Sequence, residues 1–265
     1  MEDYVNSATK GLRNFLLQTI PTPSATKRPW RSEGFVVPEE GGEFGAGRVT
    51  VSPAYFMQRL EVFGQVQFSF FWLILIQRLQ DPIVASASYS CVEVQEWLAA
   101  LSTTEFFWNA VTAAVAPDLF AAGAHTISKV NEEVQGLIKS ARVSQALSQW
   151  PSVFSGLEII ANRTTPSHRD AGGAPSHFDL LVSLGRNHEA KLTLPDVQAE
   201  LDYFPGTMVF ISGKVLEHSV GPWINGERLV IAHFMKDKVH NRLGVPRPAF
   251  PTQSFFLKLV GRGRR

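Results

Sequence analysis

Disulfides and membrane spans are both missing from this sequence. The 265 residues include one cysteine, Cys91, so no disulfide can form within the chain, and such a chain is typical of a reducing compartment. The most apolar run, FSFFWLILI at residues 68–76, is about half as long as a membrane span. The first residues lack the basic start and the apolar stretch of a secretory signal. We therefore expect a soluble intracellular protein that has no membrane partner.

An excess of charge of one sign is missing as well. The formal net charge is +1 at pH 7, so binding to nucleic acid would need a local basic surface. Three groups of basic side chains could bind phosphates, or could simply be solvated. They are Lys27, Arg28 and Arg31, then Lys236, Lys238 and Arg242, and the tail Gly261–Arg265.

What the sequence does contain indicates three segments that form one integrated catalytic unit. Residues 1–50 predict a short helix and an extended arm rich in proline and glycine. Residues 51–150 show helical patterns, with a helix start at Ser52–Pro53 and a capping box over 102–105, and predict a helical lobe packed on the core. Residues 151–265 carry short apolar runs between Gly, Pro and polar clusters, as in an all-β barrel or double sheet. The expected fold class is α+β.

Histidine and aspartate at positions i and i+2 occur twice, in SHRDAGG and in SHFD. In a strand these two positions point the same way, so His168 and Asp170, or His177 and Asp179, could aim at one point. Two imidazoles and a carboxylate form the facial triad that holds non-haem Fe(II). His218, in GKVLEHSVGP, can supply the distant imidazole.

The surroundings of the two pairs favour the first. SHFDLLVSLG is a strand that is apolar on both faces, so its pair begins a core strand, whereas HRDAGG ends a strand beside flexible glycines. Ligands at the mouth of a barrel belong in the second setting, so we assign the metal to His168, Asp170 and His218. Ten residues after His218, Arg228 opens the apolar strand RLVIAHFM, and its planar fork suits the carboxylate of a cosubstrate.

These segments together resemble a known superfamily. The H-x-D motif, LVSLG, PGTMVFISG, HSV and GERLVIAHFM resemble the Fe(II)/2-oxoglutarate dioxygenases. Within that superfamily, residues 213–245 are most similar to the TET/JBP nucleic-acid base oxygenases, in particular to short, single-domain members of the fungal type. The resemblance implies a double-stranded β-helix (jelly-roll) core with the N-terminal helical lobe as its support.

The resemblance also implies roles for individual residues. His168, Asp170 and His218 would bind Fe(II), and Arg228 would form a salt bridge with 2-oxoglutarate, with ascorbate as the reductant in vitro. Asn162 lies where related AlkB enzymes place an asparagine that contacts the cosubstrate; it could equally be a turn residue at a strand end.

Three further residues are candidates for contact with a substrate base. Strict alternation places Phe234 on the same face of its strand as Arg228, which favours a stacking or pocket role for Phe234. His233, on the other face, is an alternative base contact. Asp179 could accept a hydrogen bond from an exocyclic amine, or it could pair with a nearby arginine.

The function implied is oxidation of methylated DNA bases, with the base flipped out of the duplex. The substrate would be 5-methylcytosine, converted to hydroxymethyl and higher oxidation products, or N6-methyladenine, which would be demethylated. We expect the protein to act as a monomer in the nucleus. Two alternatives remain open. One is a protein side-chain hydroxylase of the prolyl type, and the other is a β-barrel binding protein without activity.

Overall fold

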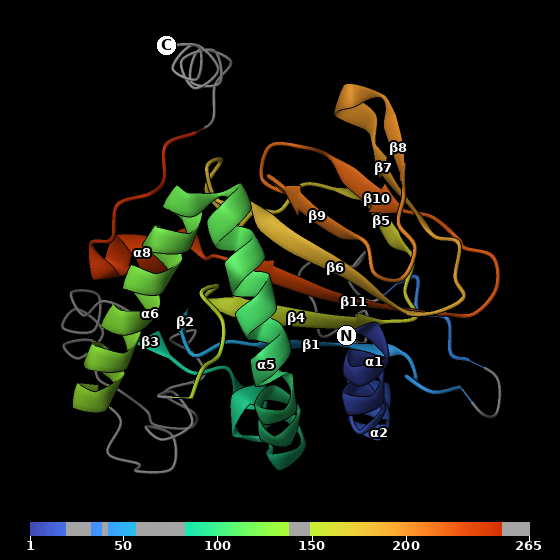
Figure 1. Cartoon of the computed structure of the whole chain (residues 1–265), viewed down its shortest axis with the longest axis horizontal. Coiled ribbons are helices and arrows are strands. Elements are labelled where there is room, and N and C mark those ends of the chain that lie inside the picture. The colour runs from blue at the N-terminus through green and yellow to red at the C-terminus, as the bar shows by residue number, and fades with distance from the viewer. Residues whose placement is uncertain (20–32, 39–41, 57–82, 138–148, 251–265) are drawn as a thin grey trace, which may run out of the picture.

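Two antiparallel sheets form the centre of the protein (Figure 1). The computed structural model describes residues 1–19, 33–38, 42–56, 83–137 and 149–250. The larger sheet has the strand order β1–β4–β11–β6–β9, with bounds Gly47–Val51, Gly156–Ala161, Glu227–Phe234, Asp179–Arg186 and Met208–Ile211. The smaller sheet has the order β5–β10–β7–β8, with bounds Thr165–His168, His218–Val220, Lys191–Leu194 and Ala199–Asp202.

Helices cover the outer face of the larger sheet. The α-helices that the structure describes are α1 (Glu2–Lys10), α2 (Arg13–Leu17), α5 (Val92–Val115), α6 (Pro117–Leu137) and α8 (Asp237–Leu243). Short connecting elements are β2 (Tyr55–Phe56), β3 (Ile83–Val84), and the 3-10 turns Ala87–Ser90 and Pro195–Val197. This arrangement is the expected α+β fold, a double-stranded β-helix with helices on one side. None of the described helices is both long enough and apolar enough to span a membrane.

Strand β11 separates two hydrophobic cores. Leu229 and Ile231 belong to the core between the larger sheet and the helices, while Val230 belongs to the core between the two sheets. Successive side chains of a strand point to opposite faces. Arg228 and Phe234 therefore face the interior between the sheets, together with Val230.

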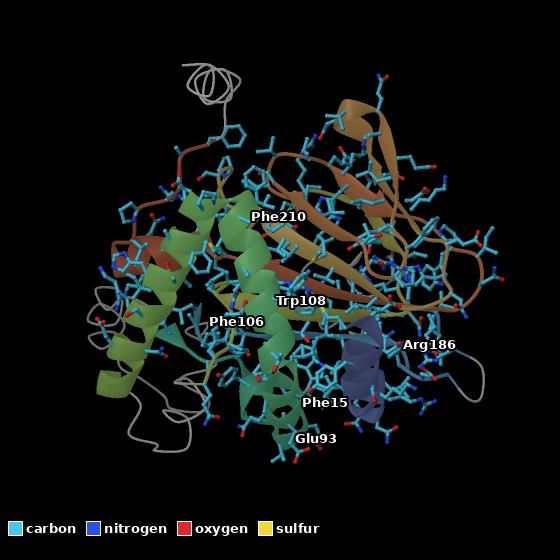
Figure 2. The ribbon with its side chains drawn as sticks, viewed as in Figure 1. Phe15, Glu93, Phe106, Trp108, Arg186 and Phe210 are labelled. Carbon is cyan, nitrogen blue, oxygen red and sulfur yellow. The ribbon has the colours of Figure 1, made fainter. Side chains whose placement is uncertain are left out.

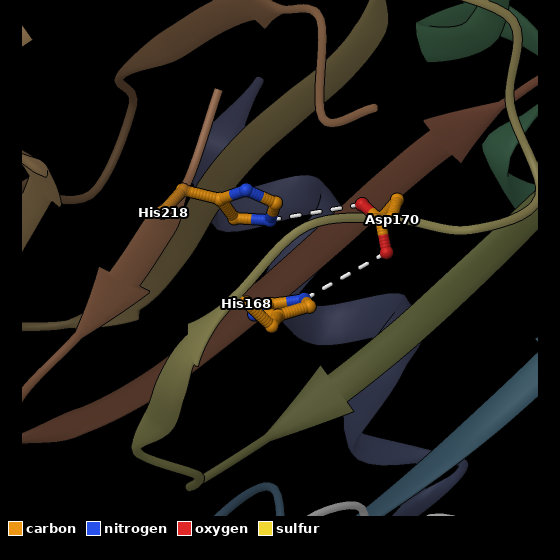
Figure 3. A group of neighbouring side chains, drawn as sticks. All are labelled: His168, Asp170 and His218. Atoms are coloured by element: carbon orange, nitrogen blue, oxygen red, sulfur yellow. Dashed lines mark ion pairs between the residues drawn. The ribbon is translucent and has the colours of Figure 1, made fainter. Parts of the chain in front are cut away.

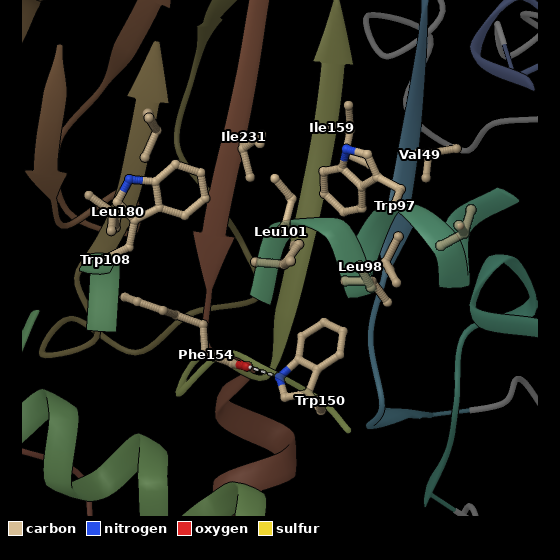
Figure 4. Close-up of a cluster of buried hydrophobic side chains, with 14 of the residues drawn as sticks. Val49, Trp97, Leu98, Leu101, Trp108, Trp150, Phe154, Ile159, Leu180 and Ile231 are labelled. Carbon is tan, nitrogen blue, oxygen red and sulfur yellow. Dashed lines mark hydrogen bonds between the residues drawn. The ribbon is translucent and has the colours of Figure 1, made fainter. Parts of the chain in front are cut away.

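The helix-side core depends on the aromatic residues of α5. Trp97, Leu101 and Trp108 pack against Ile159 of β4 and Ile231 of β11 (Figure 4). Burying one tryptophan removes about 200 Å² from water, which at about 25 cal/mol per Å² corresponds to about 5 kcal/mol. This packing fixes the sheet whose opposite face forms the interior of the barrel.

Helix α5 is longer than its sequence pattern predicts. The expected capping box, Ser102 to Glu105, lies in the middle of a continuous helix from Val92 to Val115. Glu105 is fully buried, so it does not cap a helix end. Trp108 on the sheet side is 2% exposed, whereas Phe106 on the outer side is 76% exposed (Figure 2).

The strands expected after residue 150 are present, but one strand of the barrel lies much earlier. Strand β1, at residues 47–51, pairs with β4 along its whole length, so the larger sheet includes the end of the segment predicted to be an arm. The helix expected from Ser52–Pro53 is also wrong at its start, because Tyr55 and Phe56 form β2. The apolar run at 68–76 lies outside the described residues.

Candidate metal and cosubstrate site

His168, Asp170 and His218 converge on one point between the sheets (Figure 3). His168 ends β5 and His218 begins β10, and these two residues are partners across the antiparallel strand pair. Asp170 Oδ1 lies 3.7 Å from His168 Nε2, and its Oδ2 lies 3.6 Å from His218 Nε2. One possible ligand atom from each residue lies within 4.8 Å of the others. Among the described residues, this is the group of three that could hold a metal ion.

Backbone carbonyls set the orientation of both imidazoles. His168 Nδ1 lies 2.9 Å from the carbonyl of Pro166, and His218 Nδ1 lies 3.1 Å from that of Leu216. A carbonyl only accepts, so each Nδ1 carries a proton, and each Nε2, which faces Asp170, is the ring nitrogen that can bind a metal. Burial and the neighbouring His218 lower the pKa of His168, which favours the neutral, metal-binding form.

Gly213 allows the carboxylates of the site to approach one another. Its carbonyl accepts a hydrogen bond of 2.7 Å from the backbone N–H of Asp170. A Cβ at this position would lie 2.6 Å from Asp170 Oδ2 and 2.8 Å from Asp179 Oδ2. A larger residue at this position would therefore push the two carboxylates away from their present places. Burial raises the pKa of Asp179 well above its usual range, and Asp170 and Glu158 raise it further.

Arg228 is a buried cation that has no carboxylate partner among the described residues. Its side chain is 3% exposed, Nη1 donates a 2.7 Å hydrogen bond to the carbonyl of Arg163, and Nε has no partner. Burial lowers its pKa to about 10. Tyr203, whose ring centroid lies 5.6 Å from the guanidinium carbon, also has a buried hydroxyl without a partner. Unsatisfied buried donors are costly, so this arrangement fits a ligand that carries a carboxylate.

Asn162 lies directly after the end of β4, as one of its two expected roles requires. Its backbone is left-handed, with φ of 47°, and its amide nitrogen donates to the carbonyl of Gly45 at 2.6 Å and to Glu227 Oε1 at 2.9 Å. Its amide oxygen accepts a 2.9 Å bond from the backbone N–H of Arg228. The side chain thus acts as a strand-end turn residue that fixes Arg228, the second of the two expected roles, and direct contact with a cosubstrate stays a prediction.

A cavity of about 160 Å³ opens beside the triad. Its lining is Arg48, Thr50, Glu158, Asp170, Ala171, Gly172, Gly173, Asp179, Leu181, Ala232, Phe234, Met235 and Lys236. Phe234 and Asp179, two of the three predicted base contacts, line it, and their contact with a base stays a prediction. A Cβ on Gly156 would come within 2.4 Å of the Phe234 ring, so this glycine leaves the space that the ring occupies.

His233 does not line the cavity, and the prediction that it contacts a base is wrong. It is fully buried on the helix side of β11, where Nε2 lies 3.0 Å from Glu105 Oε1 and Nδ1 lies 3.1 Å from the carbonyl of Leu180. The ring of Trp108 meets its ring edge-on at 5.0 Å. His233 is therefore a satisfied core histidine, because alternation turns it away from Phe234.

The rival pair, His177 and Asp179, is split between two environments. Asp179 enters the cavity, whereas the ring of His177 packs 4.4 Å from that of His240 on α8. His177 is 1% exposed, and neither of its ring nitrogens has a hydrogen-bond partner in the described part of the chain. Because Asp179 begins β6 and His177 precedes that strand, the i and i+2 rule for strands does not apply to this pair.

Sequence reasoning missed Tyr203, Gly213, Arg48 and Glu158. Tyr203 precedes the Pro205–Gly206 turn, and Gly213 follows the next strand. The sequence around both positions indicates a turn, and nothing in it indicates a role in ligand binding. Arg48 and Glu158 come together through the pairing of β1 with β4, which joins segments more than a hundred residues apart. Local pattern gives no hint of such a contact.

Comparison with known proteins identifies a family for this chain. Residues 85–237 match the Tet_JBP family, described as the oxygenase domain of the 2OGFeDO superfamily. Among solved structures, one titled "NgTET1 in complex with 5mC DNA" aligns with 72% of this chain and 73% of that chain, at 16% identity and a TM-score of 0.43.

A cupin 2 conserved barrel domain protein from Salinispora arenicola CNS-205 aligns with 34% of this chain and 69% of that chain, at 11% identity and a TM-score of 0.25. A search of curated proteins gives no significant match. The family match spans more than half of the chain and ends at the first residue of α8. The chain belongs to the Tet_JBP family and is an oxygenase of the superfamily that uses Fe(II) and 2-oxoglutarate.

Proposed function

We propose that this oxygenase acts on methylated bases of DNA, namely 5-methylcytosine, N6-methyladenine or both. The observation that carries the proposal is the cavity beside Asp170, which places a buried carboxyl, Asp179, and an aromatic ring, Phe234, next to the metal ligands. A flat, methylated, amine-bearing ring needs these two features. The family to which the chain belongs is consistent with such a substrate.

His168, Asp170 and His218 would hold the iron, and Arg228 with Tyr203 would bind the distal carboxylate of 2-oxoglutarate. When bound, this pair of cofactors supplies the oxidising power that converts a methyl C–H bond to C–OH with O₂, while 2-oxoglutarate is released as succinate and CO₂. The protein orients these groups through the carbonyls of Pro166 and Leu216 and through Asn162, which binds the backbone of Arg228.

Asp179 is the proposed contact for the exocyclic amine of the base. The residue is 8% exposed and lies at the start of β6 on the cavity wall. Both proposed substrates carry an amine, and a buried polar group that loses its partner costs about 1–3 kcal/mol. A base without this amine would therefore bind less well. Phe234 supplies an apolar surface for the ring of the base, where stacking contributes about 1–3 kcal/mol.

A base inside a duplex cannot reach this cavity, so flipping is part of the proposal. Lys236 lies at the cavity, and Lys238 and Arg242 follow on α8, where they can contact phosphates beside the flipped base. The other expected phosphate contacts, residues 27–31 and the basic tail 261–265, lie outside the described residues. A monomeric form and a nuclear location belong to the same proposal.

The position of the methyl group decides the product. A methyl on carbon gives a hydroxymethyl group that is stable and can be oxidised further. A methyl on nitrogen gives an N-hydroxymethyl group that releases formaldehyde and leaves the bare amine. One active site can thus act as a methylcytosine oxidase and as a methyladenine demethylase.

The test is mass spectrometry of nucleosides after incubation of both methylated duplexes with protein, Fe(II), 2-oxoglutarate and ascorbate. We expect hydroxymethylcytosine from one duplex, adenine from the other, or both. His168→Ala should abolish the products, and Asp179→Asn should lower kcat/KM at least tenfold while leaving DNA-independent succinate formation intact. Succinate formation without either nucleoside product would contradict the proposal and would favour a protein side-chain substrate.

A further inference from the structure

An ion pair that the proposed chemistry does not use lies on the wall of the cavity. Arg48 of β1 and Glu158 of β4 are joined by two hydrogen bonds, from Nε to Oε1 and from Nη2 to Oε2, the second at 2.7 Å. Thr50 Oγ1 donates a third bond to Glu158 Oε1 at 3.1 Å. The side chains are 12% and 14% exposed. The pair is therefore nearly buried and rigidly held.

The strand register places this pair in the substrate cavity. Thr50 is the partner of Glu158 across β1 and β4, and Glu158 is the partner of Ala232 across β4 and β11. Ala232 in turn pairs with Leu181 of β6. All four lie on the cavity lining, as does Arg48. Arg48 on β1 and Asp179 on β6 thus stand on opposite sides of the same cavity.

Arg48 has hydrogen-bond donors that Glu158 does not use. Its Nε and Nη2 are used by Glu158, and among the described residues no acceptor lies within hydrogen-bond distance of Nη1. Nη1 is also absent from the buried atoms that lack partners, so it has accessible surface. Arg48 lines the cavity, and its guanidinium, which pairs with Glu158, thus keeps two N–H groups on Nη1 that have no acceptor among the described residues.

The pairing of the Arg48 guanidinium with Glu158 determines which kind of ligand atom its remaining donors can bind well. A buried ion pair seldom adds stability over an apolar pair of the same size, so stability alone does not account for it. A guanidinium neutralised by a carboxylate attracts a phosphate weakly, yet it still donates to a neutral acceptor. Ring nitrogens and carbonyl oxygens of a base are such acceptors, and each good base contact contributes about 1–3 kcal/mol of discrimination.

We propose that Arg48, positioned by Glu158 and Thr50, is a specificity-determining residue that donates a hydrogen bond to an acceptor on the flipped base. This inference rests on the proposed function. The base then meets a carboxyl from β6 and donors from β1, so amine-bearing bases that also carry an acceptor are preferred.

The test compares Arg48→Met/Glu158→Met, which replaces the pair by apolar side chains, with Arg48→Lys and with Arg186→Met as a control. Arg186 also forms an ion pair, with Glu43 at 2.9 Å, but lies outside the cavity. We measure melting temperature, DNA-independent succinate formation, the salt dependence of duplex binding, and kcat/KM on both methylated duplexes. Arg48→Lys covers the case in which the double variant does not fold.

We expect both Arg48 variants to keep succinate formation and the salt slope of the wild type, while kcat/KM falls ten- to a hundredfold and Arg186→Met remains unchanged. An unchanged kcat/KM would overturn the role of Arg48. A salt slope reduced by about one would overturn it too, because that is the mark of a lost phosphate contact. A wild-type protein that forms succinate but no modified nucleoside would instead reject the proposed function itself.

Discussion

His168 and His218 are direct partners across the β5–β10 strand pair, with ring centroids 4.3 Å apart. The two imidazoles are therefore brought together by sheet pairing, although fifty residues separate them along the chain. Asp170 follows two residues after His168, and the backbone bond from its N–H to Gly213 holds it in place. The metal site is thus built into the smaller sheet and its edge.

Metal binding should stabilise the protein through these three residues. In the absence of oxygen, Mn²⁺ or Co²⁺ at a hundred times its Kd should add about 2.7 kcal/mol to the free energy of unfolding. The shift in melting temperature should disappear in His218→Ala and remain in His177→Ala, which removes the rival histidine. A shift that survives in His218→Ala but is lost in His177→Ala would place the metal elsewhere.

Replacing Arg228 should separate stability from cosubstrate binding. The guanidinium is buried and its Nε lacks a partner, so Arg228→Met should leave the cofactor-free protein as stable as the wild type or more stable by about 1–3 kcal/mol. The same variant should raise the KM for 2-oxoglutarate at least a hundredfold, because the carboxylate loses its cation. Denaturant unfolding and steady-state kinetics test both parts, and an unchanged KM would exclude the assignment.

His233 should matter for folding and not for substrate binding. Its contact with Glu105 lies in the helix-side core, where both side chains are 0% exposed. His233→Leu leaves the carboxyl of Glu105 buried without a partner and should cost about 3–5 kcal/mol. The double variant with Glu105→Leu should recover much of that loss. A selective rise in the KM for DNA, without lower stability, would return His233 to the substrate site.

Stability should fall as the pH drops below 6.5, in part through His240. Burial, and then the neighbouring His177, lower the pKa of His240 from its ordinary 6.5 to about 4. Asp237 raises this pKa in part, and Arg247 lowers it further. The unfolded state thus binds more protons between these two values, so the stabilisation is complete above pH 6.5 and is lost toward pH 4. The shift corresponds to about 3 kcal/mol. The free energy of unfolding, measured at several pH values between 4 and 6.5, should change less with pH in His240→Asn than in the wild type. The same pH dependence in both proteins would show that His240 is not its source.

Local pattern predicted the parts of the site that depend on strand alternation and on spacing. Alternation along β11 placed Phe234 with Arg228 and turned His233 away, although His233 was kept as a candidate. The sequence left two roles open for Asn162, and its left-handed backbone at the strand end matches the turn residue of the two. Alternation could not predict the Arg48–Glu158 pair, which depends on the register between β1 and β4.

The most direct test of the account is an anaerobic titration of the protein with Fe(II) and 2-oxoglutarate, followed through the visible charge-transfer absorption of the chelate that they form. The wild type should develop this absorption with one iron per chain. His218→Ala should lose it, Arg228→Met should need far more 2-oxoglutarate, and Arg186→Met should behave as the wild type. A wild type that fails to develop the absorption, or a His218→Ala variant that develops it normally, would contradict the assigned centre.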